Sequence, residues 1–370
     1  MNSLERKELR YQRRKKKRED KLITNSNKYA DVNNCFVFNK VYGYAKKCTR
    51  NVGYKKSTIN FKLHMFSIVG STCYNIKNNC YKVGKTNKFK INERGKIRDI
   101  DAPLIQDRLV HKVISNEILI PLYDSKLIYD NGASTINKGF SFAIKRVKTI
   151  LRKWFNKYGL NGYVVIIDYS KFFESCSHDI IHEIHTKYIR KPNIIKIIED
   201  YLFIGKGLGL GIEIAQREAL IYPNKLDKFI INKGIPIIRY MDDSLFLCHS
   251  YEESTYILKE YKDISDKLHI KINLNKTKIV PISKCFKFCK WNYHLTDEGI
   301  VYLWVYNKTI YRQRRKLRKM IKKNIDINDI NCSITCFKAY LILGNCYNNI
   351  KYLDKFRFVA CDFSNLKRVF

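Results

Sequence analysis

The chain has 370 residues, 45% of them hydrophobic, which allows more than one sizeable core and excludes a disordered protein. Its 71 Lys and Arg residues against 34 Asp and Glu residues give a formal net charge of +37. A surface this positive repels itself unless a polyanion lies close, and nucleic acid is the simplest such partner. A solvated basic face, or a lysine excess inherited from an AT-rich genome, is the competing interpretation.

No apolar run approaches the length of a membrane span, and no signal-peptide pattern opens the chain. Twelve cysteines without a secretory signal indicate a reducing compartment, so we expect a cytoplasmic protein with no membrane partner. The pairs Cys285/Cys289 and Cys332/Cys336 have a spacing that zinc sites allow. We interpret them instead as buried thiols.

Residues 5–21 form a run of positive charge. Such a run is either a disordered or frayed basic helix, or an arm that touches RNA. Further along, residues 95–103 predict a strand, on which Lys96 and Arg98 share one face because side chains alternate along a strand. Residues 140–156 then predict a long basic helix with an apolar face.

Residues 164–168 (Val-Val-Ile-Ile-Asp) have the composition of a buried strand that ends in an acid, Asp168. Residues 239–243 (Arg-Tyr-Met-Asp-Asp) lie between apolar runs, 229–238 before and 245–247 after, which predicts strand, tight turn and strand. If the two strands are neighbours, Asp168, Asp242 and Asp243 share one small space. Their repulsion requires a cation, and carboxylate oxygens favour Mg²⁺. The alternative is that Asp-Asp is only a polar turn.

Residues 205–211 form a glycine-rich loop that opens a helix at Glu213, and Pro223 should kink this helix. Glycines let the backbone approach a ligand closely, and helix N-termini favour phosphate. Downstream we expect a helix from Ser250, a strand at 270–281 that carries Lys276, and two strands at 286–295 and 300–305.

From about residue 308 the pattern becomes helical and strongly basic. Arg312, Arg315 and Lys319 recur at three- and four-residue spacing, so they share one face of the predicted helix. Many like charges on one helix repel one another unless phosphate offsets them, although a solvated charged helix is the alternative.

In order and spacing, these motifs resemble the bacterial-type reverse transcriptases: the lineage of group II introns, retrons, diversity-generating retroelements and defence-associated enzymes. Residues 168–173 resemble the family's first palm motif, and residues 240–243 are its Tyr-x-Asp-Asp motif. Residues 207–216 lie where its nucleotide-binding motif belongs, residues 274–277 resemble its lysine motif, and residues 286–291 its primer grip. The chain departs from the usual Gln-Gly-x-x-x-Ser-Pro pattern, since it has Leu210, Gly211 and Gln216 there and Ala215 in place of Ser.

The resemblance implies an α+β right-hand polymerase with fingers, an antiparallel-sheet palm and a small helical thumb. It divides the chain into a basic arm (1–34), fingers (35–160), a palm with the primer-grip hairpin (161–305) and a thumb (306–370).

It also implies roles for single residues, which we list by kind. Asp168, Asp242 and Asp243 would be catalytic and, with the backbone of Tyr169, would hold two Mg²⁺ ions, for which Mn²⁺ can substitute. The substrate would be bound by Lys96, Arg98, Phe173, Leu210, Gly211, Gln216 and Lys276. Nucleic acid would be bound by Arg312, Arg315 and Lys319.

The implied reaction is RNA-directed DNA synthesis: dNTPs are added to a primer 3′-hydroxyl, or to a nascent DNA strand, on a template RNA. The setting would be a bacterial or phage retroelement or an antiphage system, with an associated non-coding RNA or accessory protein left open. Two alternatives keep the fold. One is untemplated or protein-primed DNA synthesis in antiphage defence, and the other is a non-catalytic, maturase-like RNA-binding protein.

Overall fold

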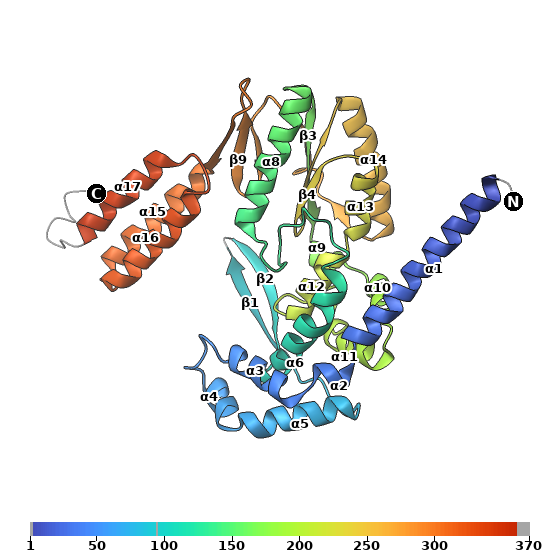
Figure 1. The fold of residues 1–370 in the computed structure, drawn as a ribbon. Helices are drawn as coiled ribbons and strands as arrows, with labels where there is room; N and C mark the ends of the chain where they lie inside the picture. The colour runs from blue at the N-terminus through green and yellow to red at the C-terminus, as the bar shows by residue number, and fades with distance from the viewer. Residues whose placement is uncertain (1–2, 94, 361–370) are drawn as a thin grey trace.

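The computed structural model describes residues 3–93 and 95–360, and it combines helices with antiparallel sheets (Figure 1). The last ten residues of the predicted thumb lie outside the described residues. In chain order the elements are α1 (Ser3–Tyr29), α2 (Val32–Cys35), α3 (Phe38–Cys48), α4 (Lys56–Leu63), α5 (Met65–Lys77), β1 (Asn87–Glu93), β2 (Lys96–Ala102), α6 (Ile105–Val113), the π-helical turn η1 (Ile114–Leu119), α7 (Ile120–Tyr123), α8 (Phe140–Tyr158), β3 (Tyr163–Ser170), α9 (Phe172–Ser175), α10 (His178–Tyr188), α11 (Pro192–Leu202), α12 (Glu213–Ile221), α13 (Asn224–Asn232), β4 (Ile237–Tyr240), β5 (Asp243–Cys248), α14 (Tyr251–Lys267), β6 (Lys271–Ile272), β7 (Lys278–Pro281), β8 (Phe286–Phe288), β9 (Trp291–Leu295), β10 (Val301–Val305), α15 (Asn307–Lys322), α16 (Ile327–Leu341) and α17 (Tyr347–Ala360).

The central sheet has the strand order β4-β5-β3-β6, and β7 also pairs with β3. All of its pairings are antiparallel. Both faces of this sheet are covered, which explains why β3 and β5 read as continuous apolar runs rather than alternating ones. Val164 packs into the core on one face, and its neighbour Val165 packs into the core on the other, as the alternation of side chains requires.

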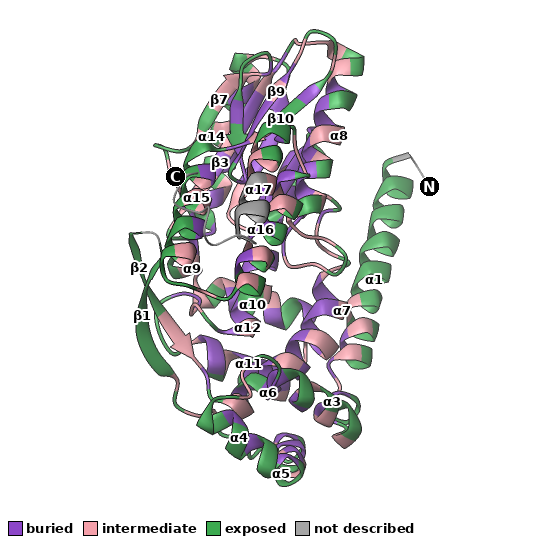
Figure 2. Ribbon diagram, turned by 90° about the vertical axis from the view of Figure 1, so that its left-hand side faces the viewer, coloured by how far each residue is buried: buried purple, intermediate pink, exposed green. Residues whose placement is uncertain are grey.

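The two cores divide the molecule. One contains α10, α13, α14 and the N-terminal helices, including Tyr188, Leu226 and Tyr261. The other contains α8, the three-stranded sheet β10-β9-β8 and the C-terminal helices, including Leu317 and Ile334. The central sheet therefore separates α13 and α14 from α15–α17, and Figure 1 shows these groups on opposite sides of it. The burial map in Figure 2 shows the purple interior concentrated on the sheet and the helices against it.

Three predicted strands differ from the structure. Residues 229–231 belong to α13 rather than to a strand, because Pro223 ends one helix and Asn224 begins the next. The predicted strand at 270–281 is divided into β6 and β7 by a turn that carries Lys276. The predicted strand at 286–295 is the hairpin β8–β9, whose turn has positive φ angles at Cys289 and Lys290.

The cysteine interpretation is partly wrong. Cys289 is buried, but Cys285, Cys332 and Cys336 are exposed. Cys332 and Cys336 lie one turn apart on the outer side of α16, where the periodicity of the helix leaves them facing solvent. Among the described residues, no group of three or more His, Cys, Asp or Glu side chains is arranged to hold a metal.

The basic run at the N-terminus is a continuous helix, α1, which projects from the body of the molecule (Figure 1). Its residues are largely exposed until the last turns, where Ser26 is buried against the rest of the protein, as is Ala30 just after the helix. No described helix combines the length and the apolar composition that crossing a membrane requires.

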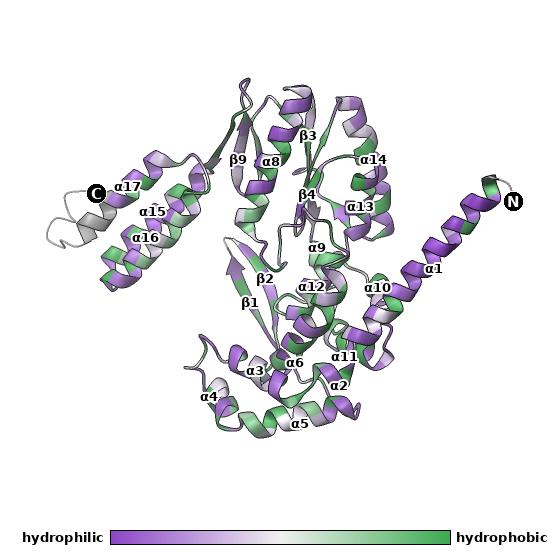
Figure 3. Cartoon of the chain, viewed as in Figure 1, coloured by the Kyte–Doolittle hydropathy of each residue, from purple (hydrophilic) through white to green (hydrophobic). Residues whose placement is uncertain are grey.

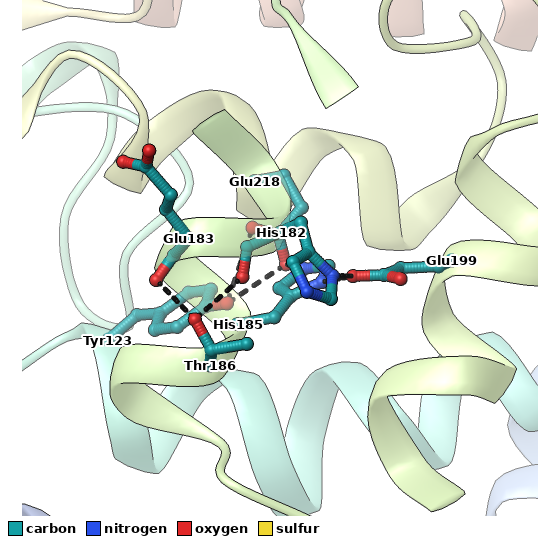
Figure 4. A network of polar contacts seen from close by, with 7 residues as sticks. All are labelled: Tyr123, His182, Glu183, His185, Thr186, Glu199 and Glu218. Atoms are coloured by element: carbon teal, nitrogen blue, oxygen red, sulfur yellow. Dashed lines mark hydrogen bonds and ion pairs between the residues drawn. The ribbon is translucent and has the colours of Figure 1, made fainter. Parts of the chain in front are cut away.

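A buried polar network joins four helices beneath the central sheet (Figure 4). His185 of α10 is fully buried between two glutamates: its Nδ1 lies 2.8 Å from Glu199 of α11, and its Nε2 lies 3.3 Å from Glu218 of α12. The hydroxyl of Tyr123, from α7, donates to Glu218 at 3.1 Å. Burial lowers the pKa of His185, but Glu218 and Glu199 outweigh it and raise that pKa to about 9. An imidazolium therefore links the two carboxylates.

We expect His185→Gln to lower the free energy of unfolding by about 3–5 kcal/mol at pH 6.5, because it leaves the buried Glu218 without a cation. The wild-type contribution is fully present below the ordinary pKa of 6.5 and is lost as the pH rises through about 9. Denaturant unfolding of both proteins from pH 6 to 9.5 should therefore show their difference shrink with pH. His182→Gln is the matched control, since His182 contacts the same Glu199 but is 54% exposed. A difference that does not depend on pH would contradict a charged His185.

Candidate active site

The turn between β4 and β5 presents two aspartates at the edge of the central sheet. Tyr240 pairs with Asp243, so Met241 and Asp242 are the two turn residues. Met241 has a φ of 56°, and two-residue hairpin turns require a positive φ at this place. A side chain there costs about 1–2 kcal/mol, a strain that is typical of functional turns.

Asp168 on β3 lies directly opposite Asp243 on β5, so the predicted neighbouring strands are confirmed. Burial raises the pKa of Asp243 to about 7, and repulsion from Asp242 and Asp168 adds to this effect. Burial also raises the pKa of Asp242, again with a contribution from Asp168. Three carboxylates at this spacing cannot all be charged without a nearby cation.

Lys276 supplies part of that positive charge. Its Nζ lies 2.9 and 2.8 Å from the two carboxylate oxygens of Asp168. Asn273, in the same turn, donates from its side-chain amide to Asp168 at 3.2 Å and from its backbone N–H to the Asp168 carbonyl at 2.8 Å. The role of Asn273 was not predicted, since an Asn in a turn gives no signal of its own in a sequence.

Arg239, just before the acidic turn, is a second residue whose role was missed. Its side chain is fully buried and forms an ion pair at 2.7 Å with Asp227 of α13, which is equally buried. It also donates to the carbonyls of Leu220, at 2.7 Å, and Met241, at 3.2 Å. Arg239 therefore ties the strained turn to the end of α12 and to α13. A charged residue inside an apolar strand is the signal that could have identified it.

Two glycines of the loop at residues 205–211, Gly207 and Gly211, lie close to the backbone of other segments of this protein. Gly207 has positive φ, and its Cα lies against the backbone of Phe173 and Glu174, where a Cβ would collide. Gly211 has a φ of +104°, and a Cβ there would lie 2.7 Å from the carbonyl oxygen of Asp101 on β2. The loop therefore seats α12 against both β2 and the segment after Asp168.

The remaining predicted residues lie at different distances from the acids. Arg98 is near enough for its charge to lower the pKa of Asp242, although it also pairs with Glu93 at 3.0 Å. Lys96 is exposed on the same strand face, and Leu210 accepts a backbone hydrogen bond from Asp101. Gln216 donates to Ser134 at 2.8 Å rather than facing the acids.

Two aromatic residues follow Asp168. The ring of Tyr169 is buried on the helical side of the sheet, where its hydroxyl lies 2.5 Å from that of Tyr261, so only its backbone can serve the acidic cluster. Phe173 is half-buried, and its carbonyl accepts from the N–H of Leu208 in the glycine loop at 2.7 Å. Phe172 is a core aromatic.

The donor set suits a hard divalent cation. Asp168, Asp242 and Asp243 offer only oxygen ligands, and the ammonium of Lys276 already stands in for a cation at Asp168. These side chains are not yet gathered around one point, because both oxygens of Asp168 face Lys276. A metal ion at this position would have to take Asp168 from the lysine.

A model of the family described as reverse transcriptase (RNA-dependent DNA polymerase) matches residues 83–293. The chain belongs to the reverse transcriptases. The matched span of this reverse transcriptase runs from the segment before β1 into β9, and it contains the acidic turn, Lys276 and the glycine loop. Its fold is the α+β right-hand polymerase, with an antiparallel-sheet palm and a helical thumb.

Solved structures give distant likenesses. One is apo telomerase from Candida tropicalis truncated from its C-terminal domain, with 12% sequence identity and a TM-score of 0.46; the match covers 62% of this chain and 58% of that chain. A second apo telomerase from Candida tropicalis has 12% identity and a TM-score of 0.46, and the match covers 59% of this chain and 47% of that chain. Telomerase from Candida albicans in complex with a fragment of telomeric RNA has 10% identity and a TM-score of 0.46, and the match covers 78% of this chain and 62% of that chain. The reverse transcriptase thus spans less than two thirds of each of these chains. No curated protein matches it.

Gly211→Ala should destabilise the loop that joins α12 to β2, since its Cβ meets the Asp101 carbonyl and its φ disfavours any side chain. We expect a loss of roughly 1–3 kcal/mol in unfolding free energy. Gly205→Ala is the matched control, because no atom lies within 4 Å of the Cβ it would add. Thermal unfolding of the two variants checks this, and equal melting temperatures would show that the loop adapts freely.

Proposed function

We propose that this reverse transcriptase is an active RNA-directed DNA polymerase that adds dNTPs to a primer 3′-hydroxyl on a template RNA. The observation that carries the proposal is the pairing of Asp168 with Asp243 beside Asp242, with the pKa values of both turn acids raised. Crowded, half-buried carboxylates at the end of a sheet are an arrangement that a purely structural turn has no reason to maintain.

Asp168 and Asp242 would hold two Mg²⁺ ions, or Mn²⁺ in their place, with Asp243 and the Tyr169 backbone in support. Such ions lower the pKa of the primer hydroxyl and neutralise the triphosphate. Lys276, released from Asp168, would stand beside the triphosphate as a proton donor to the leaving pyrophosphate. Before its release, the hydrogen bond with Asp168 raises the pKa of Lys276 and so keeps it protonated.

The triphosphate would be bound from the β2 side. Lys96 and Arg98 share one face of that strand, and Arg98 already acts electrostatically on Asp242. Leu210, Gly211 and Gln216 would border the nucleotide from the loop and the first turn of α12. Phe173 would lie under the sugar and exclude a 2′-hydroxyl.

The template–primer would lie along α15. Arg312, Arg315 and Lys319 are exposed on this helix, whereas Ile310 and Leu317 turn to the core. Arg314 instead stacks on Tyr352, with its guanidinium 3.9 Å from the ring centroid, so it fastens the thumb rather than binding phosphate.

We propose a division into an arm (1–34), fingers (35–160), palm (161–305) and thumb (306–370). The limits at 160/161 and 305/306 fall between elements, whereas the limit at 34/35 lies inside α2. From the motif residues we further propose the bacterial-type lineage and a retroelement or antiphage setting. Protein-primed or untemplated synthesis is the alternative, and sequencing the 5′ end of the product together with its template distinguishes the two.

Asp242→Asn should abolish primer extension, since it removes one ligand charge from the acidic cluster. RNA affinity should stay within about twofold, because phosphate contacts elsewhere supply it. Extension assays with Mg²⁺ and filter binding measure the two effects. Asp297→Asn, at an exposed hairpin tip, is the control. Extension by Asp242→Asn within severalfold of the wild-type rate would contradict the assignment of the metal ligands.

Phe173→Val should raise ribonucleotide incorporation relative to deoxynucleotide incorporation, because the shortened side chain leaves room for a 2′-hydroxyl. The measurement is the ratio of the two incorporation rates on one template. Phe172→Leu, at the neighbouring buried ring, should lower stability without changing this ratio. If Phe173→Val also leaves the ratio unchanged, Phe173 is only a core aromatic.

A further inference from the structure

A cavity of about 390 Å³ lies among α10, α13 and α14, away from the proposed active site. Four lysines line it: Lys187, Lys225, Lys228 and Lys267. Its apolar part includes the buried rings of Tyr188 and Tyr222, and Glu183 is the one acid in its lining. The cavity therefore combines an aromatic floor with a positively charged rim.

These lysines lack the acidic partners that usually accompany such a cluster. None of the four forms an ion pair with a carboxylate among the described residues. Burial lowers the pKa of Lys228, and repulsion from Lys187 and from the nearby Lys126 lowers it further, whereas the charge of Asp227 acts in the opposite direction. All four lysines are exposed, and an anion bound among them would offset their mutual repulsion.

Asn224 adds an amide to the lining of the same cavity. Its side chain is only 5% exposed, and its amide oxygen has no hydrogen-bond partner among the described residues. An amide oxygen only accepts hydrogen bonds, so Asn224 would contact a phosphate only through its NH₂ group. The lysines therefore carry the argument for an anion.

The positive surface continues from this cavity onto α1. Lys126 feels the charges of both Lys187 and Lys21, so it bridges the cavity to the helix. Lys21 shares one face of α1 with Arg10, Arg14 and Lys17, since these residues recur at intervals of three and four. All four are exposed, and Figure 3 shows α1 as strongly hydrophilic along most of its length. At 27 residues the helix is about 40 Å long, enough to follow a nucleic-acid backbone over many phosphates.

This surface cannot be part of the template–primer cleft. α13 and α14 pack on one face of the central sheet, whereas the thumb helices pack with the core on the other. Figure 1 likewise shows α1 and α17 at opposite ends of the molecule. A strand bound along α15 therefore leaves the lysine cavity and α1 free.

We propose that the lysine cavity and the Arg10–Arg14–Lys17–Lys21 face of α1 form a second nucleic-acid surface, which binds the phosphodiester backbone of a folded RNA outside the polymerase cleft. This inference rests on the proposed function only in taking RNA as the natural polyanion. Contacts to phosphate alone predict binding that depends on shape and salt rather than on sequence.

The test uses full-length protein with template–primer bound at saturation and a labelled 3′-blocked RNA hairpin as the second ligand. Lys187→Gln/Lys225→Gln/Lys228→Gln should weaken hairpin binding and flatten the slope of log affinity against log salt by about two to three units. Its extension of annealed template–primer should stay within about twofold of the wild-type rate. Arg10→Gln/Arg14→Gln/Lys21→Gln should behave in the same way.

The matched control is Arg312→Gln/Arg315→Gln/Lys319→Gln, which removes equal charge from the thumb. It should weaken template–primer binding and spare the hairpin. A DNA hairpin of the same sequence tests whether the surface prefers RNA or DNA. Binding of either hairpin through these lysines supports the surface, and the hairpin that binds more tightly identifies the preferred nucleic acid. Displacement of the hairpin by template–primer, or equal hairpin slopes in the lysine and thumb variants, would overturn the proposal. Hairpin binding needs no catalysis, so an inactive polymerase would leave this result interpretable.

Discussion

Repulsion among three carboxylates at one edge of the central sheet is the constraint on which the rest of the structure depends. Asp168 and Asp243 are held opposite each other by strand pairing, and Asp242 is held beside them by a two-residue turn. Burial raises the pKa values of both turn acids, so the arrangement costs free energy whenever no cation is present. Lys276 offsets part of that cost and is the group that a metal ion would displace.

Keeping like charges together requires a rigid support. Arg239 provides this support, because its buried contacts join the acidic turn to Asp227 and to the end of α12. The imidazolium of His185 then links α12 to α10 and α11. Gly211 seats the start of α12 against β2, the strand that carries Arg98. The acidic edge and the proposed triphosphate side are thus connected through one helix.

The basic surfaces show how charge is distributed around this centre. A polymerase must hold template–primer on the side of its thumb, and α15 presents exposed arginines there. The lysine cavity and α1 lie across the sheet from that helix. A second site for a polyanion would give part of the net charge of +37 a physical reason.

The central hairpin, the pairing of β3 with β5 and the helix that begins after Ser250 were predictable. Buried strands have continuous apolar runs, turns have polar residues, and a serine commonly caps the start of a helix. Elements whose ends depend on tertiary contacts were not. Residues 229–231 are as apolar as a strand but continue a helix, and Lys276 lies in a turn that forms because Asn273 bonds to Asp168. The partners of Arg239 and His185 come from helices far apart in the sequence, so local patterns could not indicate them.

The most direct test of the acidic cluster is a crystal structure with Mn²⁺, template–primer and a non-reactive dNTP analogue, with anomalous scattering used to locate the metal. The account predicts Mn²⁺ bound by Asp168 and Asp242, with Lys276 moved away from Asp168 towards the triphosphate. Absence of a metal between these acids, with Lys276 still paired to Asp168 in the complete complex, would contradict it.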